Sequence, residues 1–205
     1  MSAFIPEPNQ ATSINPFNPN KTYKMSSQTH LVPTFTLFFL SLVVFSPSTA
    51  SADKKLVVKI CHAHKDIIRD TERCLKTLSK PEIVVAHDIN QLVDLVMKDG
   101  ASKAKKTLDV IKEMMKKPTS PAALTALKTC AKVYRYCVNG FKLVGQEIYV
   151  DALTANYDAA LIRPEVDLCV KALQAAKLDE AQLAEGNVEL NFYSALGYGM
   201  TVDLS

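Results

Sequence analysis

The sequence predicts an all-α protein: an antiparallel four-helix bundle with an N-terminal helical hairpin and two disulfides. Three observations predict this fold. Apolar residues recur at three- and four-residue spacing in four long segments, which is the pattern of a helix with one buried face. No segment alternates apolar and polar residues for long enough to form a sheet. Short connections separate the four segments, as in bundles whose neighbouring helices run antiparallel.

The first 52 residues are expected to be an extension and a signal peptide that are removed on export. Residues 34–45 carry no charge but are too few to span a bilayer, which needs about 20 apolar residues. They fit the apolar part of a signal peptide better than the alternative, a buried core helix, because Ala50-Ser51-Ala52 follows them as a cleavage pattern. Asp53 then becomes the first mature residue. Met25 lies closer to this signal than Met1 and is the expected start of translation.

Cleavage leaves 205 − 52 = 153 residues, which suit a single domain. We expect residues 53–80 to form the hairpin and residues 81–205 the bundle, together in one domain. Residues 53–142 carry 19 basic and 10 acidic side chains, a net charge of +9, whereas residues 143–205 carry 3 and 10, a net charge of −7. This split indicates either solvated helix faces or steering towards a charged partner or wall polysaccharide. Nucleic acid is not expected as a partner, because no basic patch is interleaved with aromatic residues.

The first two long helices are predicted by apolar stripes. One helix is expected over residues 81–117, with a bend at Gly100. Its stripes are Val85, Ile89, Leu92 and Val96, then Ala104, Leu108, Ile111 and Met115. The next helix is predicted by a heptad seam, and Ser120 is expected to cap its start with Pro121 in the first turn. The seam consists of Leu124, Leu127, Ala131, Tyr134, Val138, Phe141, Gly145 and Ile148.

The last two helices follow the same logic. Leu153, Tyr157 and Ala160 are expected to begin the apolar face of the third helix. Pro164 is expected to interrupt this helix, since proline removes a backbone donor, and Cys169 and Leu173 continue the face. The fourth helix is predicted by Leu183, Leu190, Tyr193, Gly197, Met200 and Leu204.

All five cysteines lie in the mature part of the chain, where export favours disulfides and the odd number leaves one thiol over. Cys130 and Cys137 cannot bridge each other, because seven residues of helix rise about 10.5 Å, beyond the Cα separation of a disulfide. Cys61 and Cys74 form the natural local pair. Cys169 then pairs with Cys130 or with Cys137, and periodicity does not decide between them.

The ordered motifs of the mature chain resemble the plant invertase/pectin methylesterase inhibitor family. These motifs are Ile60-Cys61, Cys74-Leu75-Lys76-Thr77-Leu78, Ala126-Leu127-Lys128-Thr129-Cys130-Ala131-Lys132-Val133-Tyr134, and Ala159-Ala160-Leu161 shortly before Cys169. The resemblance implies bridges Cys61–Cys74 and Cys130–Cys169, with Cys137 free. It also implies a four-helix bundle with an N-terminal helical hairpin, and a secreted, non-catalytic inhibitor of a cell-wall carbohydrate-active enzyme.

The resemblance leaves two enzymes as targets. Leu168 and Leu173 stand where many pectin methylesterase inhibitors have Thr and Phe, and the Pro-Lys-Phe motif of tobacco-like invertase inhibitors is absent after Cys169. Family size favours pectin methylesterase, with cell-wall or vacuolar acid invertase as the alternative. A secreted helical ligand carrier or a defence or allergen-like protein is the alternative of another class; an apolar cavity lined by several helices would favour carriage.

Catalysis and metal binding are not expected. Cys61-His62-Ala63-His64 offers three potential ligands where a structural zinc site needs four, and export favours an oxidised Cys61. Cys137 lies in mid-helix on a core flank, which favours a buried inert thiol over a nucleophile. The chain contains no G-x-S-x-G, H-E-x-x-H or glycine-rich phosphate motif. We therefore expect no catalytic residue and no cofactor.

The partner is expected to contact helices two and three of the bundle, as the resemblance implies. The candidate contact residues lie off the apolar stripes of those helices and are Gln146, Asn156, Asp158 and Arg163. The mature protein is expected to be a monomer outside the cell, in the apoplast or cell wall, with the vacuole as the alternative. It is not expected to be held in a membrane.

Overall fold

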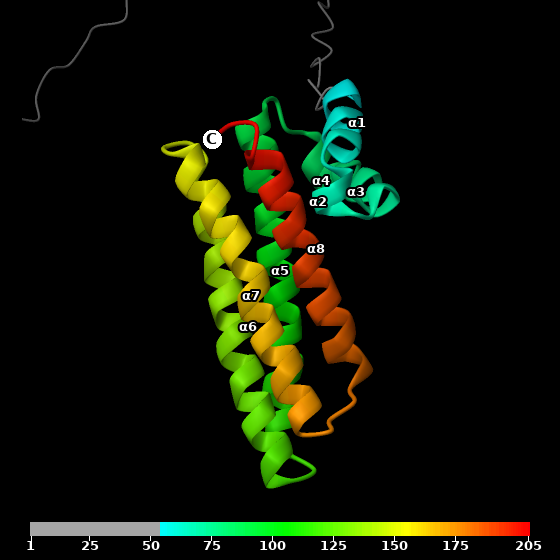
Figure 1. Ribbon diagram of the computed structural model, residues 1–205, viewed down its shortest axis with the longest axis vertical. Helices are drawn as coiled ribbons and strands as arrows, with labels where there is room; N and C mark the ends of the chain where they lie inside the picture. Colours follow the sequence, from blue (N-terminus) through cyan, green and yellow to red (C-terminus); the bar gives the residue numbers. More distant parts are fainter. Residues whose placement is uncertain (1–53) are drawn as a thin grey trace, which may run out of the picture. The chain divides into compact units, whose positions relative to one another are not determined.

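The computed structural model describes residues 54–205, so the predicted extension, signal peptide and cleavage position lie outside the described residues. The described chain folds into eight helices, with no strand among these residues (Figure 1). The helices are α1 (Lys54–Ala63), α2 (Lys65–Ile68), α3 (Thr71–Leu78), α4 (Pro81–Val84), α5 (Ile89–Lys116), α6 (Pro121–Glu147), α7 (Ala152–Ala175) and α8 (Ala181–Thr201). This all-helical fold confirms the predicted class.

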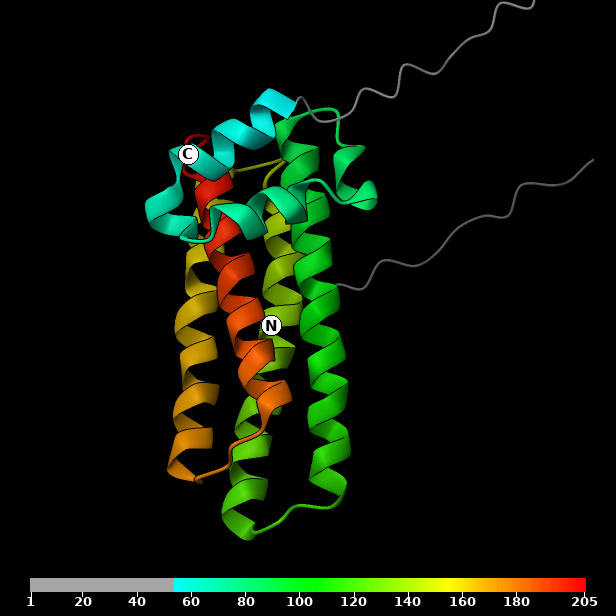
Figure 2. The same ribbon diagram turned by 90° about the vertical axis from the view of Figure 1, so that its right-hand side faces the viewer.

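The four long helices form the bundle. Helix α5 packs on α6, α6 on α7, α7 on α8, and α8 returns to α5, so that each helix has two main neighbours. Figures 1 and 2 show the four helices side by side, with the connections between consecutive helices at alternating ends of the bundle. Consecutive helices therefore run antiparallel, as the short connections predict.

Side-chain caps fix where three of these helices begin. The Asp88 carboxylate accepts a hydrogen bond from the Gln91 amide at 2.7 Å, which satisfies one free donor in the first turn of α5. Ser120 Oγ accepts from the Ala123 amide at 3.0 Å, and Pro121 occupies the first turn of α6. Asp151 caps α7 in the same way. The predicted cap at Ser120 is confirmed.

The prediction of one helix over residues 81–117 is wrong. Helix α4 ends at Val84, and α5 is a separate helix that begins at Ile89 after its N-cap residue, Asp88. The expected bend at Gly100 is also wrong, because α5 is helical through it. A Cβ atom at Gly100 would stand 3.1 Å from the Tyr193 ring, so the glycine allows the close approach of α8.

The prediction for the third helix fails in two respects. Helix α7 continues through Pro164, which is exposed. Leu153 and Tyr157, expected in the core, are 64% and 62% exposed. The buried face begins two residues later than expected. It consists of Ala155, Ala159, Ile162, Val166, Cys169 and Leu173.

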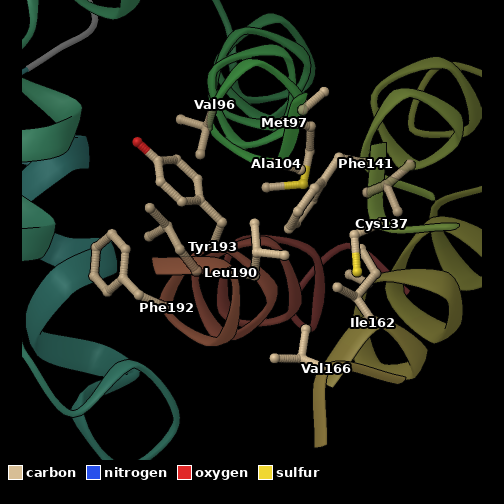
Figure 3. Close-up of a cluster of buried hydrophobic side chains, with 14 of the residues drawn as sticks. Val96, Met97, Ala104, Cys137, Phe141, Ile162, Val166, Leu190, Phe192 and Tyr193 are labelled. Carbon is tan, nitrogen blue, oxygen red and sulfur yellow. The ribbon is translucent and has the colours of Figure 1, made fainter. Parts of the chain in front are cut away.

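The centre of the bundle is a packed apolar core to which all four long helices contribute (Figure 3). Met97 and Ala104 come from α5, while Cys137 and Phe141 come from α6. Helix α7 adds Ile162 and Val166, and helix α8 adds Leu190 and Tyr193. The Phe141 and Tyr193 rings meet edge to face with centroids 6.3 Å apart, a favoured aromatic arrangement.

Two disulfides each join a pair of helices. Cys61 on α1 is bonded to Cys74 on α3, and Cys130 on α6 is bonded to Cys169 on α7, with Cα atoms 5.7 and 4.5 Å apart. These are the pairs that the resemblance implies. Cys137 is a free, buried cysteine.

The N-terminal hairpin packs on α8. Helix α2 contacts α8, and the Arg73 guanidinium forms an ion pair with Glu189. The same guanidinium lies 4.2 Å from the centroid of the Phe192 ring, within cation–π range. One side chain thus makes a charged contact and an aromatic contact with α8.

A polar cluster joins the hairpin end to α5 and α8. Lys80 Nζ and the Tyr193 hydroxyl both donate to Asp99 Oδ2, and Lys80 also donates to the Tyr193 oxygen at 3.1 Å. Burial tends to raise the pKa of Asp99, but the hydrogen bonds from Lys80 and Tyr193 and the charge of Lys80 outweigh it and hold the pKa below its ordinary value. Burial, reinforced by the Asp99 carboxylate, raises the pKa of Tyr193. The cluster therefore holds a carboxylate anion and a neutral tyrosine.

Replacing Asp99 with asparagine should lower the free energy of unfolding by about 2 kcal/mol at pH 7, because Lys80 loses its charged partner in a half-buried setting. A carboxyl group whose pKa is depressed by folding stabilises the protein above its unfolded pKa and loses that effect as pH falls through the folded pKa. The difference from the wild type should therefore begin to shrink below about pH 4, the ordinary pKa of an aspartate, and vanish only below the lowered folded pKa. Urea unfolding at pH 7 and pH 3 measures it. Asp109→Asn, at an exposed position of α5, serves as the control; equal destabilisation by both variants would contradict the assignment.

Candidate functional site

Exposed apolar side chains concentrate on α6, α7 and the turn between them. Seven of the eleven exposed large apolar residues in the described chain lie there, and none lies on α5. They are Tyr136, Leu143, Tyr149, Val150, Leu153, Tyr157 and Leu168. We call this set the α6–α7 patch. A concentration of exposed apolar side chains on neighbouring elements marks a candidate interaction surface.

Two carboxylates lie in the middle of the α6–α7 patch, one on each helix. Burial, with a further contribution from the nearby Asp158 carboxylate, raises the pKa of Glu147. Glu147 Oε2 is fully enclosed and has no hydrogen-bond partner among the described residues. A carboxyl group with a raised folded pKa stabilises the fold at low pH and loses that effect as pH rises through the folded value. Acidification should therefore protonate Glu147 sooner than an ordinary carboxylate and reduce its repulsion from Asp158.

Tyr136 of α6 belongs to the same patch. Burial, and then the Glu165 and Asp158 carboxylates, raise the pKa of Tyr136. Its hydroxyl therefore stays protonated and can act as a hydrogen-bond donor across the physiological range. The α6–α7 patch thus combines exposed aromatic and aliphatic side chains with three nearby carboxylates, those of Glu147, Asp158 and Glu165.

The sequence interpretation did not identify the α6–α7 patch. It assigned Leu153 and Tyr157 to the core, which concealed their exposure. The signal that could have revealed them is the competing stripe of Ala155, Ala159 and Ile162, which has equally regular helical spacing.

Two of the four predicted contact residues lie on opposite flanks of the α6–α7 pair. Asp158 is half-buried and faces α6 beside Glu147, within the patch. Gln146 is exposed but lines a hollow of about 460 Å³ between α6 and α5, together with Lys98 and Lys142.

The other two residues face α8. The Asn156 side-chain amide donates to the Tyr198 carbonyl oxygen at 3.1 Å and to Thr201 Oγ1 at 2.9 Å. These bonds hold α7 to the end of α8. Arg163 is exposed and lines a small hollow with Asp66 of the hairpin. The structure therefore brings the four residues together on no single surface: Asp158 lies within the α6–α7 patch, and Gln146 borders the patch at Tyr149.

Cys137 has the properties of an inert core thiol. Burial, with a smaller effect of the Glu165 carboxylate, raises the pKa of Cys137 to about 12. Thiolate is the reactive form, so this thiol is a poor nucleophile at neutral pH. Cys61 is oxidised, and His64 Nε2 lies 3.1 Å from Asp203 Oδ2. Within residues 54–205, no three potential metal ligands gather at one place.

A second hollow lies between α7, the connection after it and α8. Its volume is about 630 Å³, and its walls include Val170, Leu173, Leu178 and Val188. Asn191 Oδ1, also at this hollow, is enclosed and lacks a hydrogen-bond partner among the described residues. The hollow could accept a small apolar molecule that carries a hydrogen-bond donor.

In the described part of the chain, no helix combines the length and apolar character needed to cross a membrane. No family model matches the sequence, and no curated protein matches it. Among solved structures, the chain is similar to a mutant form, form A, of a pectin methylesterase inhibitor from Arabidopsis. The TM-score is 0.62 at 12% sequence identity, over 70% of this chain and 95% of that one. The chain therefore has the helical fold seen in that inhibitor.

Proposed function

We propose that the protein is a secreted inhibitor of plant pectin methylesterase that binds the enzyme reversibly and covers its cleft without a covalent step. The single observation that carries this proposal is the α6–α7 patch. It presents tyrosine and aliphatic side chains on two long helices held together by the Cys130–Cys169 bridge. Interface centres are enriched in such residues, and rigid presentation lowers the entropy cost of binding.

Several properties agree with a binding role rather than a catalytic one. The fold is shared with a pectin methylesterase inhibitor. The free thiol is buried. The two disulfides suit an oxidising compartment, which supports secretion to the cell wall, with the vacuole as the alternative. We regard the hairpin and bundle as one domain and the protein as a monomer.

Inhibition should be stronger at pH 5 than at pH 7. Covering the α6–α7 patch removes water from Glu147 and Asp158, and burying a charged carboxylate is costly. Because the pKa of Glu147 is raised, acid protonates Glu147 more readily than an ordinary carboxylate and lowers this cost. Glu147→Gln should therefore weaken the pH dependence.

The test is titration of pectin methylesterase and acid invertase from the same plant with the purified protein near pH 5. Tyr157→Ala should raise the inhibition constant at least tenfold, because truncation of a central interface aromatic costs about 2 kcal/mol or more. Val188→Ala is the matched control, since Val188 is 60% exposed but lies on α8. Inhibition of invertase alone would move the target to the alternative enzyme. No inhibition of either enzyme at micromolar concentration would refute the proposal.

Ligand carriage is the second candidate, and the hollow between α7 and α8 favours it. An environment-sensitive apolar dye should bind there saturably if the hollow carries ligands. Ala184→Trp, at an exposed position lining the hollow, should then abolish binding. Dye binding combined with no enzyme inhibition would place carriage, or a defence role based on it, ahead of inhibition.

A further inference from the structure

Basic side chains line both edges of the outer groove between α5 and α6. On each helix three exposed cations recur every seven residues, which places them about 10.5 Å apart along one flank. The α5 row consists of Lys98, Lys105 and Lys112, and the α6 row consists of Lys128, Arg135 and Lys142. Each row extends over about 21 Å.

The antiparallel register sets the two rows opposite each other. A Cβ at Gly145 would stand 2.9 Å from Asp94 Oδ1 and 3.4 Å from its Cα, so these two positions lie at the same level. Lys98 and Lys142 follow within one turn and line the same hollow of about 460 Å³. Seven residues further along α5 and seven residues back along α6, Lys105 and Arg135 lie at a common level. The next step of seven does the same for Lys112 and Lys128.

The charge in this groove is only partly neutralised. Asp94 pairs with Lys98 at 2.7 Å, and Asp109 pairs with Lys105 at 3.2 Å and with Lys112 at 2.9 Å. Such exposed pairs are weak, so a ligand carboxylate can replace them. The α6 row makes no ion pair with any described residue. Helix α6 has no acidic residue before Glu147. Six cations and two acids leave 6 − 2 = +4 along the groove.

The opposite flank of α5 is different. Lys103 lies 3.9 Å from Glu189 of α8, and Lys106 lines a hollow that also contains Glu185 and Glu189. Acidic side chains of α8 thus balance the lysines on that side. The side of α5 that faces α8 is therefore closer to charge balance than the side that faces α6.

We propose that the α5–α6 groove binds a linear polyuronate, such as pectin from which the methyl esters have been removed. Two parallel rows of cations complement a straight chain of regularly repeated carboxylates. Five of the six cations are lysines, which act as point charges and suit single carboxylates. No exposed large apolar side chain lies between the rows; Tyr149 stands only at their end. This absence disfavours single-stranded nucleic acid, which stacks on aromatic residues, and membranes, which need apolar anchors.

This groove meets the α6–α7 patch only at Tyr149, and its binding does not depend on which enzyme is inhibited. If the proposed inhibition also holds, the protein would concentrate on polymer that pectin methylesterase has already converted to free acid. A carboxylate-bearing product would then retain the inhibitor of the reaction that forms it.

The experiment measures binding of the purified protein to galacturonic acid oligomers and to the same oligomers fully methyl-esterified, at low and high salt near pH 6. The acid form should bind and the ester should not, and binding should weaken with salt because screening reduces attraction between exposed charges. One Lys or Arg beside an anionic surface contributes about a fivefold change in affinity. Replacing the whole α6 row with glutamine should therefore lower affinity about 100-fold.

Matched variants keep the test decisive. Lys103→Gln combined with Lys106→Gln removes charge from the opposite flank and should leave oligomer binding unchanged. The α6-row variant should keep its helical circular dichroism and its enzyme inhibition, so that loss of polyuronate binding and failure of the inhibitor proposal are distinguishable. Equal binding of acid and ester oligomers would overturn the proposal. So would preference for anionic vesicles or for an oligonucleotide over the uronate oligomer.

Discussion

Replacing Cys130 and Cys169 together with alanine should lower the free energy of unfolding by about 4 kcal/mol. The bridge closes a loop with a sequence separation of 39 residues and joins α6 to α7. Its removal returns conformational entropy to the unfolded chain, and the chain-entropy relation gives about 4 kcal/mol for a loop of this length. This loss is a large part of the 5–15 kcal/mol that stabilises a typical domain. Urea unfolding of oxidised proteins measures the difference.

The second bridge and the free thiol provide the controls. The Cys61–Cys74 pair has a sequence separation of 13, so its double alanine variant should lose about 3 kcal/mol. Cys137→Ala removes a thiol without opening a loop and should cost about 1 kcal/mol. If the Cys130/Cys169 variant were no less stable than Cys137→Ala, or if a Cys137–Cys169 peptide appeared in non-reducing maps, the assigned bridge would be wrong.

Phe141→Ala should cost about 4 kcal/mol. Phe141 is fully buried at the centre of the bundle and contacts the edge of the Tyr193 ring (Figure 3). Truncation removes the apolar contacts and leaves a cavity that the surrounding helices cannot close, because all four contribute rigid side chains to it. Thermal and urea unfolding measure the loss.

A size series separates cavity formation from general sensitivity to mutation. Phe141→Leu retains most of the volume and should cost less than about 1.5 kcal/mol. Tyr157→Ala truncates an aromatic residue on an exposed face and should change stability by less than about 0.5 kcal/mol. Equal effects at positions 141 and 157 would show that Phe141 is not the packing centre.

The sequence predicted the helices better than it predicted their orientation. The seam of α6 was correct because its large residues, such as Leu127, Tyr134 and Phe141, lie on a single face of the helix, and all three are buried. On α7 two apolar stripes compete, and the stripe with the larger residues faces solvent. Ala159 belongs in the core because α7 packs closely there: a Cβ at Gly197 of α8 would stand 3.4 Å from Ala159 Cβ. Periodicity alone does not contain this steric information.

The break before α5 could have been predicted. Asp88 followed three residues later by Gln91 is a helix-start pattern, and both side chains make capping bonds: Asp88 accepts from the Gln91 amide, and Gln91 Oε1 accepts from the His87 amide. The apolar stripe through residues 85–96 was given more weight than this cap. The capping hydrogen bonds, and not the apolar stripe, determine where α5 begins.

The contact residues show a different limit of sequence reasoning. Residues off an apolar stripe are correctly expected to be near the surface, but the stripe does not tell which neighbouring helix each one faces. Gln146 faces α5, Asn156 and Arg163 face α8 and its surroundings, and Asp158 faces α6. Only the order of helices around the bundle separates these flanks.

Because the Cys137 thiol is fully buried, its chemical labelling can report opening of the helix bundle. The thiol has no exposed surface and lies on α6 at the centre of the core. A thiol-reactive dye can reach it only when helices separate, while the four remaining cysteines are held in disulfides. The labelling rate of the unmodified protein therefore measures how readily the bundle opens, without any engineered probe.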